Sequence, residues 1–143
     1  MYFEDLEEGS ILRSRPRFIT PTDLDLFTSL TWANNPLFLS DDAARAAGMR
    51  ARIAPGALLV SIAIGLLYQT GVFDHIRAMT ELHANFLNPV SPGEVVKVEG
   101  EVVSKRVISE ATGEVTFKVQ LKNLSTNKDS ISMSMKLIHL RRK

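Results

Sequence analysis

The second half of the chain carries three runs in which apolar and polar side chains alternate. Their apolar members are Val96, Val98 and Val102 in the first run, Val115, Phe117, Val119 and Leu121 in the second, and Ile131, Met133, Met135 and Leu137 in the third. A period of two with one apolar face is typical of antiparallel strands that bury one side. Turn-forming residues at 111–113 and 127–129 separate the later runs. Further strands are predicted at 81–87 and 10–19, which makes about five in total.

Residues 57–68 are apolar on every side of a helix rather than along one stripe. Such a helix must be covered on most sides, so we expect it at the centre of the fold. It is shorter than the roughly 20 residues that cross a bilayer, and no membrane partner is expected.

Two more helices are predicted before this apolar segment. Thr20 is a helix cap followed by Pro21 and Asp23, and Ser40 precedes a short alanine-rich helix over 43–47. Between them, the asparagines and the proline of residues 31–36 indicate a loop.

These elements predict one antiparallel sheet wrapped around a central apolar helix, which is the hot-dog fold of the α+β class. No repeat or linker divides the sequence, so we expect a single domain over residues 1–143. The sheet has a second face and an edge to cover. Pairing with a second copy, as a homodimer, is therefore expected.

Composition removes several kinds of chemistry. The chain has 143 residues, 17 Lys and Arg against 16 Asp and Glu, a net charge of +1, three histidines and no cysteine. The lack of cysteine excludes a disulfide framework, a thiolate zinc site and a cysteine nucleophile. A charge so close to zero argues against a nucleic-acid partner. The acidic start of the chain lacks the pattern of a signal peptide, so a cytoplasmic location is expected.

Four segments then follow one another in an order that resembles a known family. They read TDLDLF at 22–27, NPL at 35–37, RIAPGAL with Ser61 at 52–61, and FLNPVSPGE at 86–94. Together they are similar to the MaoC-like dehydratases, the (R)-specific enoyl-CoA hydratase group of hot-dog proteins. The resemblance implies an acyl thioester of coenzyme A or acyl carrier protein as ligand. It also implies addition or removal of water across the α,β double bond, with no cofactor.

The family's catalytic loop resembles Gly-Asp-x-Asn-Pro-x-His, whose Asp and His hold a water and move the α-proton. When the loop is aligned on Asn-Pro at 35–36, the Gly position is Trp32, the Asp position is Ala33 and the His position is Phe38. Neither Ala33 nor Phe38 can hold a proton. The resemblance therefore implies that both members of the dyad are replaced.

Gly56 matches the glycine whose backbone N–H polarises the thioester carbonyl in this family. A tight turn into the helix would also require glycine at this position. The ligand-pocket candidates are Trp32, Asn34, Asn35, Pro55 and Ser61.

Each of these candidates has a second interpretation. Trp32 and Phe38 either make the cavity smaller and more apolar or fill an unused site. Ser61 matches a position that contacts the catalytic Asp, but its hydroxyl can bond its own helix instead. Asn34 and Asn35 could hydrogen-bond a ligand carbonyl or a water, and Asn35 is expected to fix the loop.

Other titratable residues are expected to have structural roles. Asp41 and Asp42 are placed to cap a helix, and His75 and His83 are expected to be exposed or hydrogen-bonded. His139 continues an apolar strand face and is expected to be a packing residue. None of these histidines has a partner at ligand spacing, so no metal site is expected.

Three hypotheses for function follow. The chain is a hydratase or dehydratase that works through altered residues. Alternatively, it is a non-catalytic acyl-thioester-binding protein, as a homodimer or as the subunit of a heteromer whose partner carries the dyad. Thioester hydrolysis comes last, because the helix over 57–68 contains no carboxylate.

Overall fold

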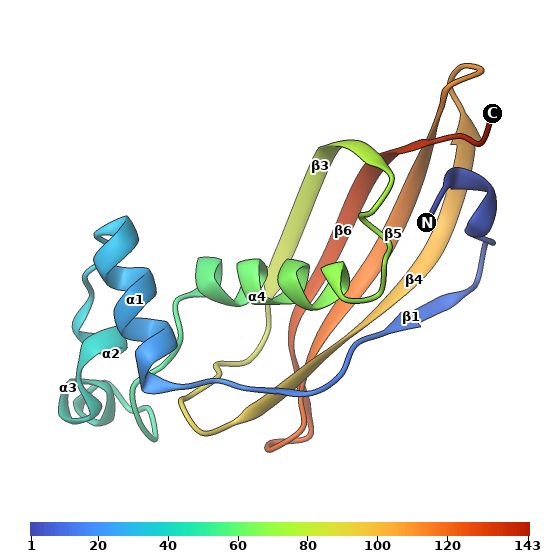
Figure 1. Ribbon diagram of the computed structural model, residues 1–143. Helices are drawn as coiled ribbons and strands as arrows, with labels where there is room; N and C mark the ends of the chain where they lie inside the picture. The colour runs from blue at the N-terminus through green and yellow to red at the C-terminus, as the bar shows by residue number, and fades with distance from the viewer.

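The computed structural model describes residues 1–143 as one antiparallel sheet with a helix across its face (Figure 1). The elements are η1 (Phe3–Asp5), β1 (Ile11–Arg13), β2 (Arg17–Phe18), α1 (Pro21–Thr31), α2 (Pro36–Leu39), α3 (Asp41–Ala46), α4 (Gly56–Tyr68), β3 (Ile76–Phe86), β4 (Val95–Val107), β5 (Thr112–Asn123) and β6 (Lys128–Leu140). The six strands lie in the order β1-β4-β5-β6-β3, and β2 also pairs with β4. This arrangement confirms the predicted hot-dog fold and its α+β class.

The core lies between α4 and the inward faces of β4, β5 and β6. All eleven apolar residues of the three predicted runs are buried. They meet the buried face of α4, which consists of Leu58, Leu59, Ile62, Ala63, Leu66 and Leu67. The alternating pattern therefore predicted both the strands and the side that each one buries.

The strand predicted at 10–19 is divided into β1 and β2. Pro16 lies between them and has no N–H to give to a neighbouring strand. Ser14 bridges the gap, because its Oγ accepts a hydrogen bond from the Val98 amide at 2.8 Å. The strand predicted at 81–87 also begins earlier, at Ile76.

The predicted loop at 31–36 is shorter than expected, because helices enter it from both sides. Thr31 is still part of α1, and Pro36 already begins α2. Proline is favoured at the first position of a helix, and the side chain of Asn35 caps α2 by accepting from the Leu37 amide at 3.0 Å. The Asn-Pro pair therefore starts a helix here.

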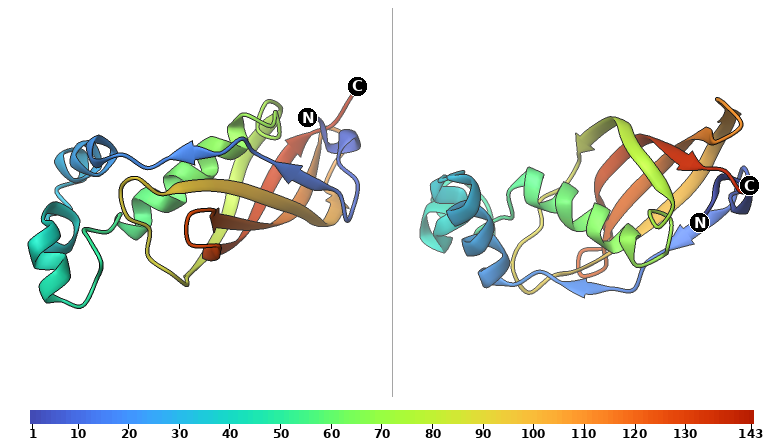
Figure 2. Two further views of the ribbon diagram at one scale, coloured as in Figure 1. Left: turned by 90° about the horizontal axis from the view of Figure 1, so that it is seen from below. Right: turned by 45° about the horizontal axis from the view of Figure 1, so that its top comes forward.

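The helices α1, α2 and α3 gather at one end of the molecule, and both chain termini lie at the other end (Figure 2). Thr20 and Asp23 cap the start of α1 reciprocally. Burial alone would raise the pKa of Asp23, but hydrogen bonds from Arg17 and Thr20 hold this pKa below its ordinary value. The Arg17–Asp23 pair, 2.9 Å apart, ties α1 to the strand that precedes it.

The expectation that α4 is covered on most sides is wrong for the single chain. Ala57, Ser61, Gly65 and Tyr68 form one exposed face along the helix. The edge strand β3 is also poorly covered, since Leu82 is 42% exposed and Phe86 is 59% exposed. A strip of apolar surface on α4 and β3 therefore has no partner within this chain.

No helix of the chain is long and apolar enough to span a membrane.

Candidate functional site

A cavity of about 310 Å³ opens where the start of α4 meets α2 and the end of β3. Its ten lining residues are Phe38, Ile53, Ala54, Gly56, Leu59, Phe86, Leu87, Asn88, Pro89 and Ser130. None of these side chains titrates. The walls are mostly apolar, and the polar groups are backbone amides, one carboxamide and one hydroxyl.

Gly56 supplies the backbone donor that the sequence predicted. It is the first residue of α4, and no side chain caps this helix end. The Gly56 N–H donates to no backbone or side-chain acceptor in the protein. An unpaired N–H at a helix N-terminus carries partial positive charge, so it can accept the negative end of a carbonyl dipole.

The missing side chain of Gly56 also has a packing reason. A Cβ at this position would lie 2.7 Å from Cε1 of Phe86. Any other residue would therefore have to displace the Phe86 ring, which packs directly on the Gly56 backbone. The close approach of β3 and the free N–H both account for glycine here.

Phe38 reaches the same cavity from α2. Two hydrogen bonds hold this part of the chain against the segment that leads into α4. The Ile53 amide donates to the Leu37 carbonyl at 2.9 Å, and the Arg52 amide donates to Asp41 Oδ1 at 2.9 Å. The structure thus brings together Phe38, at the position of the family's His, and Gly56.

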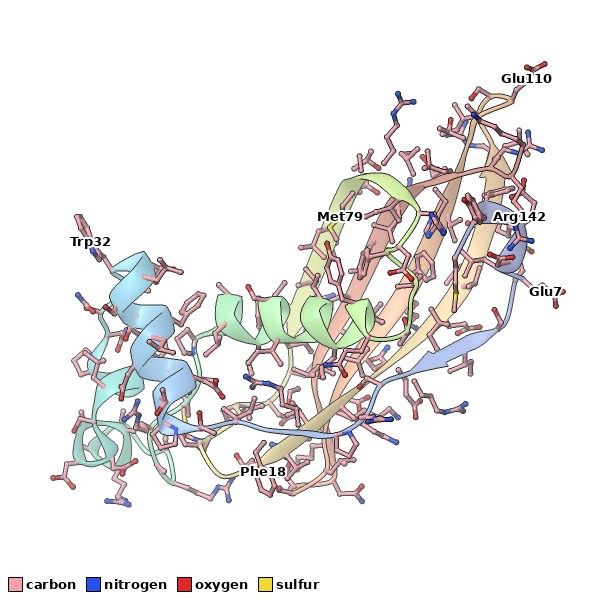
Figure 3. All side chains as sticks on the ribbon, in the orientation of Figure 1. Glu7, Phe18, Trp32, Met79, Glu110 and Arg142 are labelled. Atoms are coloured by element: carbon pink, nitrogen blue, oxygen red, sulfur yellow. The ribbon has the colours of Figure 1, made fainter.

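Trp32 does not line this cavity, contrary to the expectation from the sequence. It ends α1 in the left-handed conformation, with φ of 60°. This turn directs the indole away from α4 at the tip of α1, where it is 82% exposed (Figure 3). Trp32 therefore neither narrows the cavity nor fills the core of its own chain.

The other loop candidates also lie outside the cavity lining. Ala33 is half-buried in the turn between α1 and α2, and its amide donates to Thr31 Oγ1 at 3.3 Å. Asn34 and Asn35 are both exposed. Because the Asn35 carboxamide caps α2, its contact within the protein is structural.

Two candidates belong to α4 and its cap. Pro55 is buried immediately before the helix and does not contact the cavity. The Ser61 hydroxyl lies on the exposed face of α4 and donates to the Ala57 carbonyl at 2.9 Å. In this chain Ser61 bonds its own helix, which is one of the two alternatives that the sequence offered.

The remaining titratable candidates lie elsewhere. Asp41 accepts from the Arg52 amide, and Asp42 pairs with Arg45 on the surface. His75 stacks on Tyr2 with ring centroids 3.8 Å apart. His83 is exposed on β3, and His139 is buried in the sheet. None of the three histidines lines the cavity with Phe38.

Sequence reasoning did not single out Phe86, Asn88 or Ser130 as site residues. Phe86 and Asn88 stand in one of the segments that carried the family resemblance, and this was a usable signal. The position of Ser130 depends on an irregularity in the pairing of β5 with β6, between Leu121 and Lys122. Strict alternation along a strand cannot reveal such a shift.

The sheet wrapped on α4, and a cavity at the start of that helix, define a class of hot-dog protein. The family model described as MaoC like domain matches residues 3–123. The chain belongs to this family, and the resemblance noted in its sequence is confirmed. Structures similar to this chain include those of a MaoC-like dehydratase and of (R)-hydratases.

Individual relatives are more distant. Protein MaoC of Klebsiella aerogenes is 29% identical over 97 residues, which cover 68% of this chain but only 29% of that protein. The chain therefore spans less than a third of the length of this curated relative.

Two solved structures illustrate the likeness in fold. A monoamine oxidase regulatory protein from Archaeoglobus fulgius has 28% identity and a TM-score of 0.91, with 100% of this chain and 96% of that chain covered. The HadBC (3R-hydroxyacyl-ACP dehydratase) complex from Mycobacterium tuberculosis has 18% identity and a TM-score of 0.77, with 92% and 96% covered.

Proposed function

We propose that this protein binds an acyl thioester, of coenzyme A or of acyl carrier protein, without performing the family's hydration chemistry. One observation carries the proposal: the cavity at the start of α4 keeps the free Gly56 N–H, but holds Phe38 and no titratable side chain. The thioester carbonyl accepts a hydrogen bond from Gly56. The acyl chain lies against the apolar walls.

Hydration of an enoyl thioester needs an acid and a base near the double bond. A single positioned acid–base group contributes about 10²–10⁴-fold to a rate, so a site with neither retains only binding and carbonyl polarisation. Ala33 and Phe38 stand at the dyad positions, and none of the three histidines lies in the cavity to replace them. The arrangement therefore supports binding better than turnover.

The proposal is tested by calorimetric titration with butyryl-CoA, crotonyl-CoA and free coenzyme A, together with an assay of crotonyl-CoA hydration. We expect the acyl thioesters to bind more tightly than free coenzyme A, with no hydration above the buffer rate. The double variant Ala33→Asp with Phe38→His reintroduces both dyad groups and is expected to gain measurable hydration. Hydration by the unmodified protein would instead identify an enzyme that uses other residues, and absence of acyl-CoA binding would refute the proposal.

We further propose that the working form contains a second hot-dog chain. The exposed face of α4 and the exposed apolar residues of β3 adjoin a sheet edge with unpaired backbone groups. A second copy that pairs β3 with β3 would cover the edge and the apolar strip at once, because a two-fold axis brings identical surfaces together.

A heteromer is the second candidate, in which the other chain carries the dyad. The same uncovered apolar strip favours it, and the HadBC complex is an example of such an assembly in a protein of this fold. Purification from the native source distinguishes the two. A homodimer gives one polypeptide, whereas a heteromer gives a second MaoC-like chain with Asp and His at the two loop positions.

A further inference from the structure

Ser130 places the only side-chain hydroxyl in the lining of the cavity. It stands at the start of β6, where the pairing with β5 shifts between Leu121 and Lys122. At such a shift two successive residues of one strand oppose a single residue of the other, so Ser130 and Ile131 are both buried.

The backbone at Ser130 is held firmly against the end of β3. The Ser130 carbonyl accepts from the Leu87 amide at 2.9 Å and from the Asn88 amide at 3.4 Å. Asn88 also donates from Nδ2 to the Asp129 carbonyl at 2.7 Å. The position of the hydroxyl is therefore fixed by β3 and β6 together.

The Ser130 hydroxyl has no hydrogen-bond partner in the protein. Ser130 is 1% exposed, and its Oγ is buried without a donor or acceptor within reach. A buried hydroxyl without a partner destabilises the folded chain, and such groups are rare in native proteins. An unpaired hydroxyl in the lining of a ligand cavity therefore has its natural partner in the ligand.

We propose that Ser130 is a specificity-determining residue, whose hydroxyl donates to an oxygen on the acyl chain of the bound thioester. The inference rests on the proposed function and adds the substrate class. The favoured ligands carry a hydroxyl or keto group on the acyl chain, near the thioester. A saturated chain of the same length leaves Ser130 unpaired, and a site built to hydrogen-bond a ligand group rejects the analogue that lacks it.

The dimensions of the cavity place this oxygen near the thioester. A volume of about 310 Å³ is at the small end of the range for ligand pockets. Gly56 and Ser130 both line this space, together with the apolar side chains of Phe38 and Leu59. The two polar contacts therefore fall on one short segment of the ligand, with the thioester oxygen at Gly56 and the second oxygen at Ser130.

The test compares 3-hydroxybutyryl-CoA with butyryl-CoA by calorimetric titration of the full chain. Unmodified protein is expected to bind the hydroxylated thioester more tightly. Ser130→Ala should weaken binding of 3-hydroxybutyryl-CoA by about threefold to tenfold, as the loss of one neutral hydrogen bond predicts, and should leave butyryl-CoA binding unchanged or tighter.

Ser132→Ala is the matched control. It makes the same chemical change two positions along β6, where the hydroxyl accepts from Gln120 Nε2 at 3.4 Å outside this cavity. This variant should leave the binding of both thioesters unchanged.

A melting experiment separates the ligand role from a structural one. Since Ser130→Ala removes an unpaired buried hydroxyl, its melting temperature in the absence of ligand should equal or exceed that of unmodified protein. A marked fall would show that the hydroxyl supports the fold, and would overturn the inference.

The possible failures are distinguishable. If unmodified protein binds neither thioester, the proposed function fails, and the role of Ser130 fails with it. If both bind but Ser130→Ala changes their affinities equally or not at all, the proposed function stands and only the role of Ser130 is overturned.

Discussion

His139 illustrates at the scale of a single residue how burial fixes a protonation state. The residue is fully buried beside Phe117, with ring centroids 5.9 Å apart. Its Nε2–H donates to the Val72 carbonyl at 2.9 Å, while Nδ1 has no partner. Burial lowers the pKa of this histidine, although the bond to Val72 acts in the opposite direction. The neutral ring is therefore the form that the core accommodates.

This lowered pKa predicts a loss of stability in mild acid. The unfolded chain takes up a proton on His139 near pH 6.5, and the folded chain does so only at lower pH. The free energy of unfolding should be constant in this respect above about pH 6.5 and should fall below it, by at most about 1.4 kcal/mol per pH unit. Urea unfolding between pH 5 and pH 8 measures this slope.

The variant His139→Gln provides the comparison for the pH experiment. It removes the titrating ring and should flatten the slope between pH 5 and pH 6.5, whatever its overall stability. His83→Gln changes an exposed histidine and should leave the slope as it is. The carboxylates with lowered pKa, such as Asp23, act at lower pH and do not confuse the result. An unchanged slope in His139→Gln would contradict the assignment.

At the scale of elements, the contact between the start of α4 and the end of β3 builds the site. Phe86 from β3 packs on the backbone of Gly56 in α4, and the cavity opens beside this contact. Phe38 joins them because α2 is hydrogen-bonded to the segment before α4. Ligand binding and the packing of these elements therefore depend on the same residues.

Gly56→Ala is expected to destabilise the protein by about 1–3 kcal/mol, since the new methyl group overpacks against the Phe86 ring. The measurement is the free energy of unfolding in urea. Phe86→Leu removes the ring, so in that background Gly56→Ala should cost clearly less. Equal costs in the two backgrounds would show that the ring contact is not what requires glycine.

At the scale of the whole molecule, the uncovered strip on α4 and β3 is the main feature that a single chain does not explain. The sheet buries its inward face on α4, but the outer face of that helix and the edge of β3 stay exposed. Exposed strand edges invite pairing with another chain. A second chain on this strip would satisfy both the edge and the apolar surface.

Gly65→Arg tests this interface at the middle of the exposed face of α4. Nothing lies within 4 Å of a Cβ at this position in the single chain, so the substitution should leave the fold intact. It should nevertheless dissociate the assembly, because a charged side chain replaces a close contact. Light scattering after size-exclusion chromatography gives the mass, and circular dichroism checks the fold.

Ala111→Arg is the control for this experiment. Ala111 is exposed in the turn between β4 and β5, at the far end of the sheet from α1. This variant should remain assembled. If Gly65→Arg keeps the mass of the unmodified protein, or if that protein is a monomer, the proposed interface is wrong.

Much of the fold could be predicted because its signals are local. The alternation of Val115, Phe117 and Val119 reports which side of β5 is buried, and a few neighbouring residues suffice to reveal it. The cap at Thr20 and the apolar run of α4 are equally local. The family resemblance added the prediction that Gly56 and position 38 belong to one site, and both line the same cavity.

The errors came where a prediction needed the path of the chain in space. The sequence placed Trp32 in the cavity, but one left-handed residue at the end of α1 turns it outward. Ser130 could not be found, because its burial follows from a register shift between two strands. By itself the sequence determined the elements, their buried faces and the replacement of two catalytic positions, since these are properties of short segments. Only the tertiary structure decided which residues share the cavity and which apolar surface stays uncovered, because both depend on how distant segments pack together.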